Sequence, residues 1–239
     1  RRRGFDRGFA TREEISNQHI DSAEQTVEAA RRWLADNPTG KRFLWLHFFD
    51  PHSPYEAHPE FDFGTRDRER YAASVAHLDR HLAPLLESIS LHPKSTVVLT
   101  ADHGEAFGEH GRHKHGHDLH VESVAIPLLI RGIGVQPGVV RMPVSLLDVM
   151  PTILHLGGAS ALPTDGQSLV PQLHGIDRDL DRTVFSERDL GEQIIAATTL
   201  DHRLIFALRL NRLRLFDSNR DPQEQTDIKE QSPEAFDRL

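Results

Sequence analysis

The stretch TVVLTADHGEAFGEHG, Thr96 to Gly111, decides the fold class of this chain. Its beginning, Thr96 to Thr100, is a short run of apolar and β-branched residues, which predicts a buried strand. Asp102 and His103 follow directly, and Gly104 then lets the backbone turn away. Ligands of open α/β sheets bind outside the carboxyl ends of the strands. The stretch therefore predicts an α/β sheet with a ligand site at the end of this strand.

Strand and helix patterns alternate on both sides of this stretch. FLWLHFF, Phe43 to Phe49, and AIPLLIR, Ala125 to Arg131, predict two further strands, and the first is expected to be buried on both faces. The helical spacing of apolar residues predicts helices over residues 17–36, 67–89 and 145–156. This alternation predicts an α/β body in which helices flank a mostly parallel sheet.

The pattern changes after Gly166. Short strand patterns then follow one another with polar breaks between them, over residues 183–187, 193–200, 203–210 and 212–216. We therefore expect two domains. Residues 1–165 would form the α/β body, and residues 166–239 would form a small C-terminal antiparallel β subdomain packed on it.

The composition is that of a globular chain without thiol chemistry. The chain has 239 residues, a net charge of -8 and no cysteine, which excludes disulfides, Cys-ligated zinc and a thiol nucleophile. The acidic balance argues against a nucleic-acid partner. No apolar run approaches the roughly 18 residues of a membrane span. Dinucleotide-binding, P-loop and serine-hydrolase motifs are all missing from the sequence.

The chemistry is expected in the segment between His103 and His120, which holds six of the 16 histidines. Asp102 and His103 offer a carboxylate and an imidazole, which are suitable ligands for a divalent cation. The alternative is structural, with Asp102 capping a turn and His103 packing against it.

Three interpretations of the polar loop after His103 stay open. In the first, its imidazoles and the Lys114 ammonium face a phosphate or sulfate. In the second, the alternating His113, His115 and His117 form a separate zinc site. In the third, the loop is hydrated and merely rich in histidine.

His52 follows the predicted strand Phe43 to Phe49 in the turn Asp50-Pro51-His52. Two strand ends that both present histidine indicate one shared crevice, where His52 could bind a charged oxygen or protonate a leaving group. A simple turn histidine is the alternative. His77 and His81 share one helix face, for which a half-exposed position is expected.

The string LTADHGEAFGEHG, followed by HGHDLHVESVAIPLLIRG, resembles the late metal motif of the sulfatases in the alkaline phosphatase superfamily. Four other stretches agree with that family in order: GFDRGF (4–9), FLWLHFFDPHSPY (43–55), PVSLLDVMPTILHLGG (143–158) and LFDSNRDPQEQTDI (215–228). The resemblance implies the alkaline phosphatase-like fold and a hydrolase of small anionic esters, arylsulfatase-like in its chemistry.

The resemblance also implies roles for individual residues. Asp102 and His103 would be ligands of one divalent metal ion, usually Ca²⁺ in the family. The nitrogen of His103 makes Mn²⁺ or Zn²⁺ possible too. His52 and His115 would be catalytic residues that contact the ester oxygens, with Lys114 as a further substrate-binding residue.

The sequence departs from the family pattern in one respect. The family's nucleophile segment, a Cys/Ser-x-Pro-x-Arg motif, is not found, so we expect a fragment that holds the C-terminal part of the catalytic chain and has little activity alone. A periplasmic, secreted or membrane-attached location is expected from the family. Phosphoryl or phosphonate ester chemistry on the same fold, and a non-catalytic His-rich metal-binding module, are the alternative functions.

Overall fold

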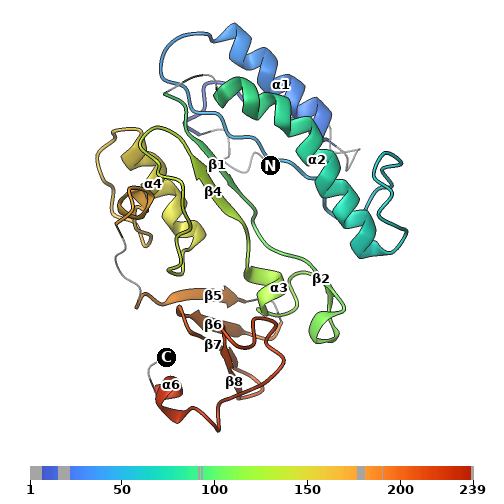
Figure 1. Ribbon diagram of the computed structural model, residues 1–239, viewed down its shortest axis with the longest axis vertical. Helices are drawn as coiled ribbons and strands as arrows, with labels where there is room; N and C mark the ends of the chain where they lie inside the picture. The colour runs from blue at the N-terminus through green and yellow to red at the C-terminus, as the bar shows by residue number, and fades with distance from the viewer. Residues whose placement is uncertain are drawn as a thin grey trace. The chain divides into compact units, whose positions relative to one another are not determined.

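The computed structural model describes residues 7–15, 22–90, 92, 94–176, 181–189 and 191–237. The chain forms two compact units, Arg1–Pro93 and Lys94–Leu239 (Figure 1). Of the GFDRGF stretch, residues 4–6 lie outside the described part of the chain. Among the helices that are described, none is both long and apolar enough to cross a membrane.

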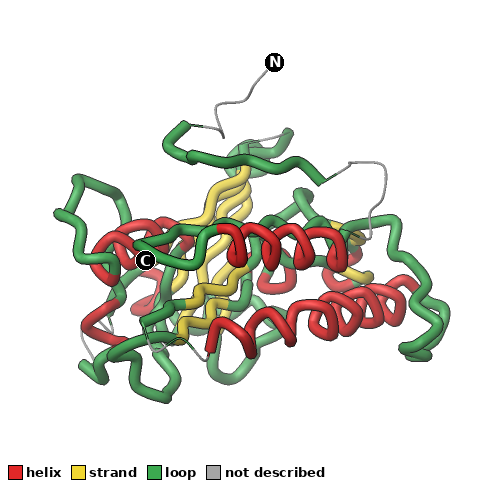
Figure 2. The backbone as a smooth tube through the Cα atoms, turned by 90° about the horizontal axis from the view of Figure 1, so that it is seen from above, coloured by secondary structure: helices red, strands yellow, loops and turns green. Residues whose placement is uncertain are grey.

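Two long helices dominate the first unit, α1 (Ala23–Asp36) and α2 (Asp67–Ser90). They pack side by side (Figures 1 and 2). Ala30 of α1 and Ala73 and Leu85 of α2 are buried, and small residues let two helix axes approach closely. Both helices were predicted by the apolar spacing, although residues 17–21 of the first prediction lie outside the described residues.

The strand predicted over Phe43 to Phe49 does not form. The segment has no strand hydrogen bonds to any described residue, and Phe43, Trp45 and Phe49 are exposed. The prediction of a buried strand was wrong because an apolar run becomes a strand only where a neighbouring strand pairs with its backbone groups. The exposed aromatic side chains remain as a feature of this unit.

The second unit begins with the predicted strand, β1 (Val97–Thr100), which pairs antiparallel with β4 (Leu128–Arg131). The segment between them folds into a small hairpin and two short helical turns: β2 (Ala106–Phe107), η1 (Glu109–Gly111), β3 (His113–Lys114) and α3 (Val121–Val124). The strands described here pair only with antiparallel neighbours, so the parallel pairing expected of the body is not seen among them.

The predicted helix after β4 forms as a 3-10 turn, η2 (Leu146–Asp148), that continues into α4 (Val149–Leu156). Ser145 and Asp148 form a capping box at its start. Asp148 is fully buried and accepts two hydrogen bonds from Arg182, at 2.7 and 2.8 Å.

Four strands form the C-terminal antiparallel meander predicted from the sequence. In order they are β5 (Val184–Arg188), β6 (Ile194–Thr198), β7 (His202–Ala207) and β8 (Arg212–Asp217). The short helices α5 (Val170–Leu173) and α6 (Pro233–Asp237) flank this sheet in the sequence. The domain boundary expected between residues 165 and 166 stays a prediction.

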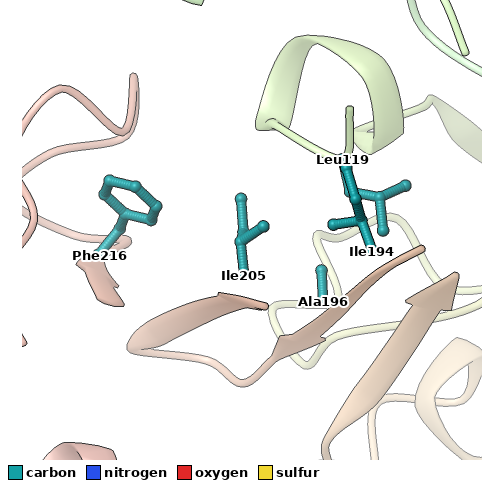
Figure 3. Close-up of a cluster of buried hydrophobic side chains, with 5 residues drawn as sticks. All are labelled: Leu119, Ile194, Ala196, Ile205 and Phe216. Atoms are coloured by element: carbon teal, nitrogen blue, oxygen red, sulfur yellow. The ribbon is translucent and has the colours of Figure 1, made fainter. Parts of the chain in front are cut away.

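The core of the second unit lies on one face of this sheet. Leu119, from the loop before α3, points toward Ile194, Ala196 and Ile205 on the strands, and Phe216 completes the cluster (Figure 3). The polar loop that follows β1 is therefore anchored to the C-terminal sheet by an apolar contact.

Candidate active site

Asp102 and His103 form a paired donor set just after β1. The His103 Nδ1 lies 2.8 Å from the Gly104 carbonyl oxygen. Because a carbonyl only accepts, Nδ1 carries the proton and Nε2 keeps the lone pair. That Nε2 lies 3.7 Å from Asp102 Oδ2. The other oxygen, Oδ1, accepts the backbone N–H of His103 at 3.0 Å, so the pair presents one nitrogen and one oxygen toward the same space.

This donor set fits a divalent metal ion. Zinc binds imidazole nitrogen and carboxylate oxygen at about 2.0–2.2 Å, so two donors 3.7 Å apart can share one ion. The Asp102 side chain is 77% exposed and that of His103 39%, which leaves both open to an ion from solution.

His115 lies against this pair. Its ring stacks on the His103 ring, with the centroids 3.8 Å apart. The His115 Nδ1 is 3.0 Å from Glu105 Oε1, and the Glu105 side chain is almost fully buried. Lys114 precedes His115 with a left-handed backbone (φ 65°) and is exposed. The structure therefore brings Asp102, His103 and His115 together.

Gly104 fixes the course of the loop. Its N–H donates to the Ser123 carbonyl at 2.9 Å, and a Cβ at this position would meet the Glu122 carbonyl oxygen at 2.1 Å. Only glycine allows two backbones to approach this closely without a shift. The sequence analysis assigned Gly104 to a turn, and its close approach to α3 is an additional reason for glycine.

A buried ionic network holds the C-terminal end of the loop that follows β1, at Leu119 to Val121. Glu224 accepts from Arg203 and from His120 Nδ1, the latter at 2.7 Å, and also accepts the N–H of Val121 at 3.1 Å. Arg203 donates in addition to the carbonyl of Leu119. Burial alone would raise the pKa of Glu224, but the hydrogen bonds from His120 and Arg203 outweigh it, so the pKa is lowered.

His110 belongs to the same network. Its ring stacks on that of His120 with the centroids 3.6 Å apart, while Nδ1 lies 2.8 Å from Glu122 Oε1 and Nε2 3.0 Å from the Glu224 carbonyl oxygen. Burial acts to lower the pKa of His110, but the Glu122 carboxylate and the Glu224 carbonyl raise it overall. Because both ring nitrogens face acceptors, His110 is suited to the charged form.

His52 lies in the first unit. Its Nδ1 is 2.6 Å from the Ser53 carbonyl oxygen and its ring stacks on Phe49, with the centroids 4.4 Å apart. The preceding turn is tied to the start of α1, because the Asp50 carboxylate accepts hydrogen bonds from the N–H and Oγ of Ser22. His52 is thus held in a defined orientation at the end of an extended segment.

The separate zinc site considered for His113, His115 and His117 is not gathered among the described residues. Among the described residues, three potential metal donors within 4.8 Å of one another are found instead on His58, Glu60 and His77, in the first unit. His113 and His117 are exposed.

A family model described as Sulfatase matches residues 2–159, well over half of the chain. The chain belongs to the sulfatase family. The choline-sulfatase of Rhizobium meliloti (strain 1021) is 29% identical to this sulfatase chain over 172 residues. The match covers 69% of this chain and 33% of the choline-sulfatase, so the chain spans about a third of the length of that relative.

Solved structures show the same fold as this sulfatase chain. The Bacteroides fragilis protein yidJ superposes with a TM-score of 0.78 at 17% identity, covering 90% of this chain and 56% of yidJ. The phosphonate monoester hydrolase of Agrobacterium radiobacter gives 0.69 at 20% identity, covering 96% of this chain and 62% of that protein. The predicted fold class, alkaline phosphatase-like α/β with a small C-terminal antiparallel sheet, is confirmed.

The sequence analysis missed the carboxylates that support the histidines of this sulfatase. Glu105 contacts His115, while Glu122 and Glu224 contact His110 and His120. Glu105 and Glu122 lie close to those histidines in sequence, and the DPQE stretch that contains Glu224 was recognised only as a family motif. No spacing rule joins Glu224 to a histidine more than 100 positions earlier.

Proposed function

We propose that the protein to which this chain belongs hydrolyses sulfate esters, with Asp102 and His103 as ligands of a divalent metal ion. The observation that carries the proposal is the Asp102 Oδ2 and His103 Nε2 pair, 3.7 Å apart, beside the stacked His115 ring. A bound divalent ion would supply positive charge that neutralises the ester and lowers the pKa of an attacking group. Membership of the sulfatase family supports the choice of sulfate.

His115 would act on the ester oxygens. Its Nδ1 faces the Glu105 carboxylate, which accepts a hydrogen bond from the Nδ1–H and stabilises the ring when it is cationic. A cationic ring carries its second proton on Nε2, where it can donate to a developing oxygen anion. Lys114, the residue before His115, would add a positive charge for substrate binding.

His52 would be a second contact to the ester. Its Nδ1 donates to the Ser53 carbonyl, which fixes the ring orientation. In the cationic form the second proton lies on Nε2, as in His115. The support for this role is the position of His52 after the Asp50-Pro51 turn, which matches the family pattern.

The test is an assay of the complete gene product, because this chain spans only 33% of the choline-sulfatase. We expect hydrolysis of p-nitrophenyl sulfate and choline sulfate that a chelator abolishes. His115→Gln should lower kcat/KM by about 10²–10⁴-fold, and Asp102→Asn with His103→Gln should abolish metal-dependent turnover. The matched control is His113→Gln with His117→Gln, two exposed histidines of the same loop, which should stay active.

Each opposite outcome is informative. Faster turnover of p-nitrophenyl phosphate or a phenyl phosphonate than of the sulfates would contradict a sulfatase and favour phosphoryl or phosphonate chemistry. Metal binding that survives loss of Asp102 and His103 but is lost in the His113/His117 variant would instead identify a His-rich metal-binding module.

A further inference from the structure

A second group of metal-ligating side chains lies in the first unit. His58, Glu60 and His77 each offer a donor atom, and these atoms all lie within 4.8 Å of one another. His58 and Glu60 belong to the loop that precedes α2, and His77 belongs to α2 itself. The group thus joins two segments that are 17 residues apart, as measured between Glu60 and His77.

The three side chains are in direct contact. The His77 Nδ1 is 2.8 Å from Glu60 Oε1, and the rings of His58 and His77 stack with their centroids 4.1 Å apart. His81, one turn further along α2, stacks on His77 at 4.4 Å. His58 is buried, the His77 side chain is 13% exposed and the Glu60 side chain 34%. The group is therefore largely sheltered, with access from solvent at the carboxylate.

Two imidazole nitrogens and one carboxylate oxygen thus gather in one place. Neutral imidazole nitrogen and one carboxylate are the donors of zinc sites with three protein ligands and an open fourth position. Imidazole donors do not suit Ca²⁺ or Mg²⁺, which take oxygen ligands.

We infer that His58, Glu60 and His77 bind a transition-metal ion, Zn²⁺ in the first instance, separately from the ion at Asp102 and His103. The two sites share no residue and lie in different compact units of the chain. The inference therefore goes beyond the proposed function and does not depend on it.

The metal would fasten the loop before α2 to that helix. Tyr55 already contacts Tyr71 of α2 edge to face, with the ring centroids 5.8 Å apart. His52 lies in the same loop, six positions before His58. An ion held by His58 and His77 would restrict the chain on the C-terminal side of His52 and so support the orientation of a predicted substrate contact.

Co²⁺ tests this site, because it substitutes for Zn²⁺ and its visible absorption reports coordination by nitrogen and oxygen donors. The purified 239-residue chain is titrated with Co²⁺ at pH 7.5. We expect one tightly bound equivalent with the intense spectrum of a four-coordinate ion. His77→Gln and Glu60→Gln should each remove that equivalent, whereas Asp102→Asn with His103→Gln should leave it in place.

His47→Gln is the matched control, since His47 is an exposed histidine of the same unit. Circular dichroism confirms that each variant is folded, and Glu60→Gln is the variant least prone to misfold because Glu60 is the most exposed of the three. The inference is overturned if the wild-type chain binds no four-coordinate Co²⁺, or if the bound equivalent disappears with Asp102 and His103 and survives loss of Glu60 and His77.

Discussion

Glu224 is the carboxylate at the centre of the buried ionic network of the second unit. Its carboxylate faces Arg203 and His120, both of which are almost fully buried. A buried charge pair adds little net stability when it is complete, but removal of one partner leaves an uncompensated charge. The cost of altering Glu224 is therefore expected to be far larger than that of altering a surface carboxylate.

Glu224→Gln should lower the free energy of unfolding by about 3–5 kcal/mol, because Arg203 would stay buried without its counter-charge. Urea denaturation followed by circular dichroism measures the loss. Glu230→Gln is the control, since Glu230 is 85% exposed and should change the free energy by less than about 1 kcal/mol. Equal effects of the two substitutions on the free energy of unfolding would show that the buried network does not stabilise the fold in solution.

At the scale of the element, the start of the η2–α4 helix depends on Asp148. The carboxylate accepts the N–H of Ser145 at 2.7 Å and that of Gln167 at 2.9 Å, besides the two hydrogen bonds from Arg182. Burial acts to raise the pKa of Asp148, but Arg182 and the backbone N–H groups lower it overall. One side chain thus caps the helix and joins it to the start of the C-terminal sheet.

Asp148→Asn should therefore reduce stability in a pH-dependent way. A carboxyl group whose pKa is lower in the folded state stabilises the fold above its unfolded pKa, about 3.9, and loses this contribution as the pH falls through the folded pKa. The difference in unfolding free energy between wild type and variant should be largest near pH 7 and shrink as the pH falls below about 4. Urea titrations at several pH values measure it.

The exposed Asp165→Asn variant serves as the reference for this series and should lie within about 0.5 kcal/mol of wild type. A wild-type advantage over Asp148→Asn that stays constant down to pH 2 would mean that the ionised carboxylate is not what stabilises the helix start.

The local sequence pattern was sufficient to predict most of the helices and strands. The helices α1 and α2, strand β1 and the C-terminal meander all follow from apolar spacing and turn residues near one another in sequence. The extended segment Phe43 to Phe49 has the same kind of local signal, yet it forms no strand, because strand formation needs a partner that no local pattern specifies.

The candidate metal-binding residues were likewise predicted only in part from the sequence. Asp102, His103 and His115 lie within 14 positions of one another, and their association was expected only from the family resemblance, because the residue pattern alone left the role of the loop open. The His58, Glu60 and His77 group was not predicted, since His77 was considered only with its helical neighbour His81. The spacing His-x-Glu before a helix bearing His-x-x-x-His is the signal that could have revealed it.

At the scale of the whole molecule, a row of exposed aromatic side chains lies on the extended segment Phe43 to Phe49. Phe43 is 56% exposed, Trp45 60% and Phe49 47%. Exposed apolar groups of this size, on a backbone segment without strand partners among the described residues, favour association with other chains.

The isolated chain should therefore self-associate as its concentration rises, and Trp45→Lys should weaken that association. Sedimentation velocity over a concentration series measures the effect. Val139→Lys is the control. Val139 is a large apolar residue that is 86% exposed, but it lies far from the aromatic row in the sequence. A chain that stays monomeric at every concentration would contradict this prediction.

The contacts of Arg203 and Glu224 have a consequence for the order of events during synthesis. The loop with Asp102 and His103 leaves the ribosome well before the residues that hold it, since Arg203 reaches a carbonyl 84 positions earlier and Glu224 a histidine 104 positions earlier. Contacts between residues this far apart form late. We therefore expect the nascent loop to stay unorganised until the final strands emerge, so that a ribosome stalled before residue 224 carries Asp102 and His103 without the contacts that hold their loop.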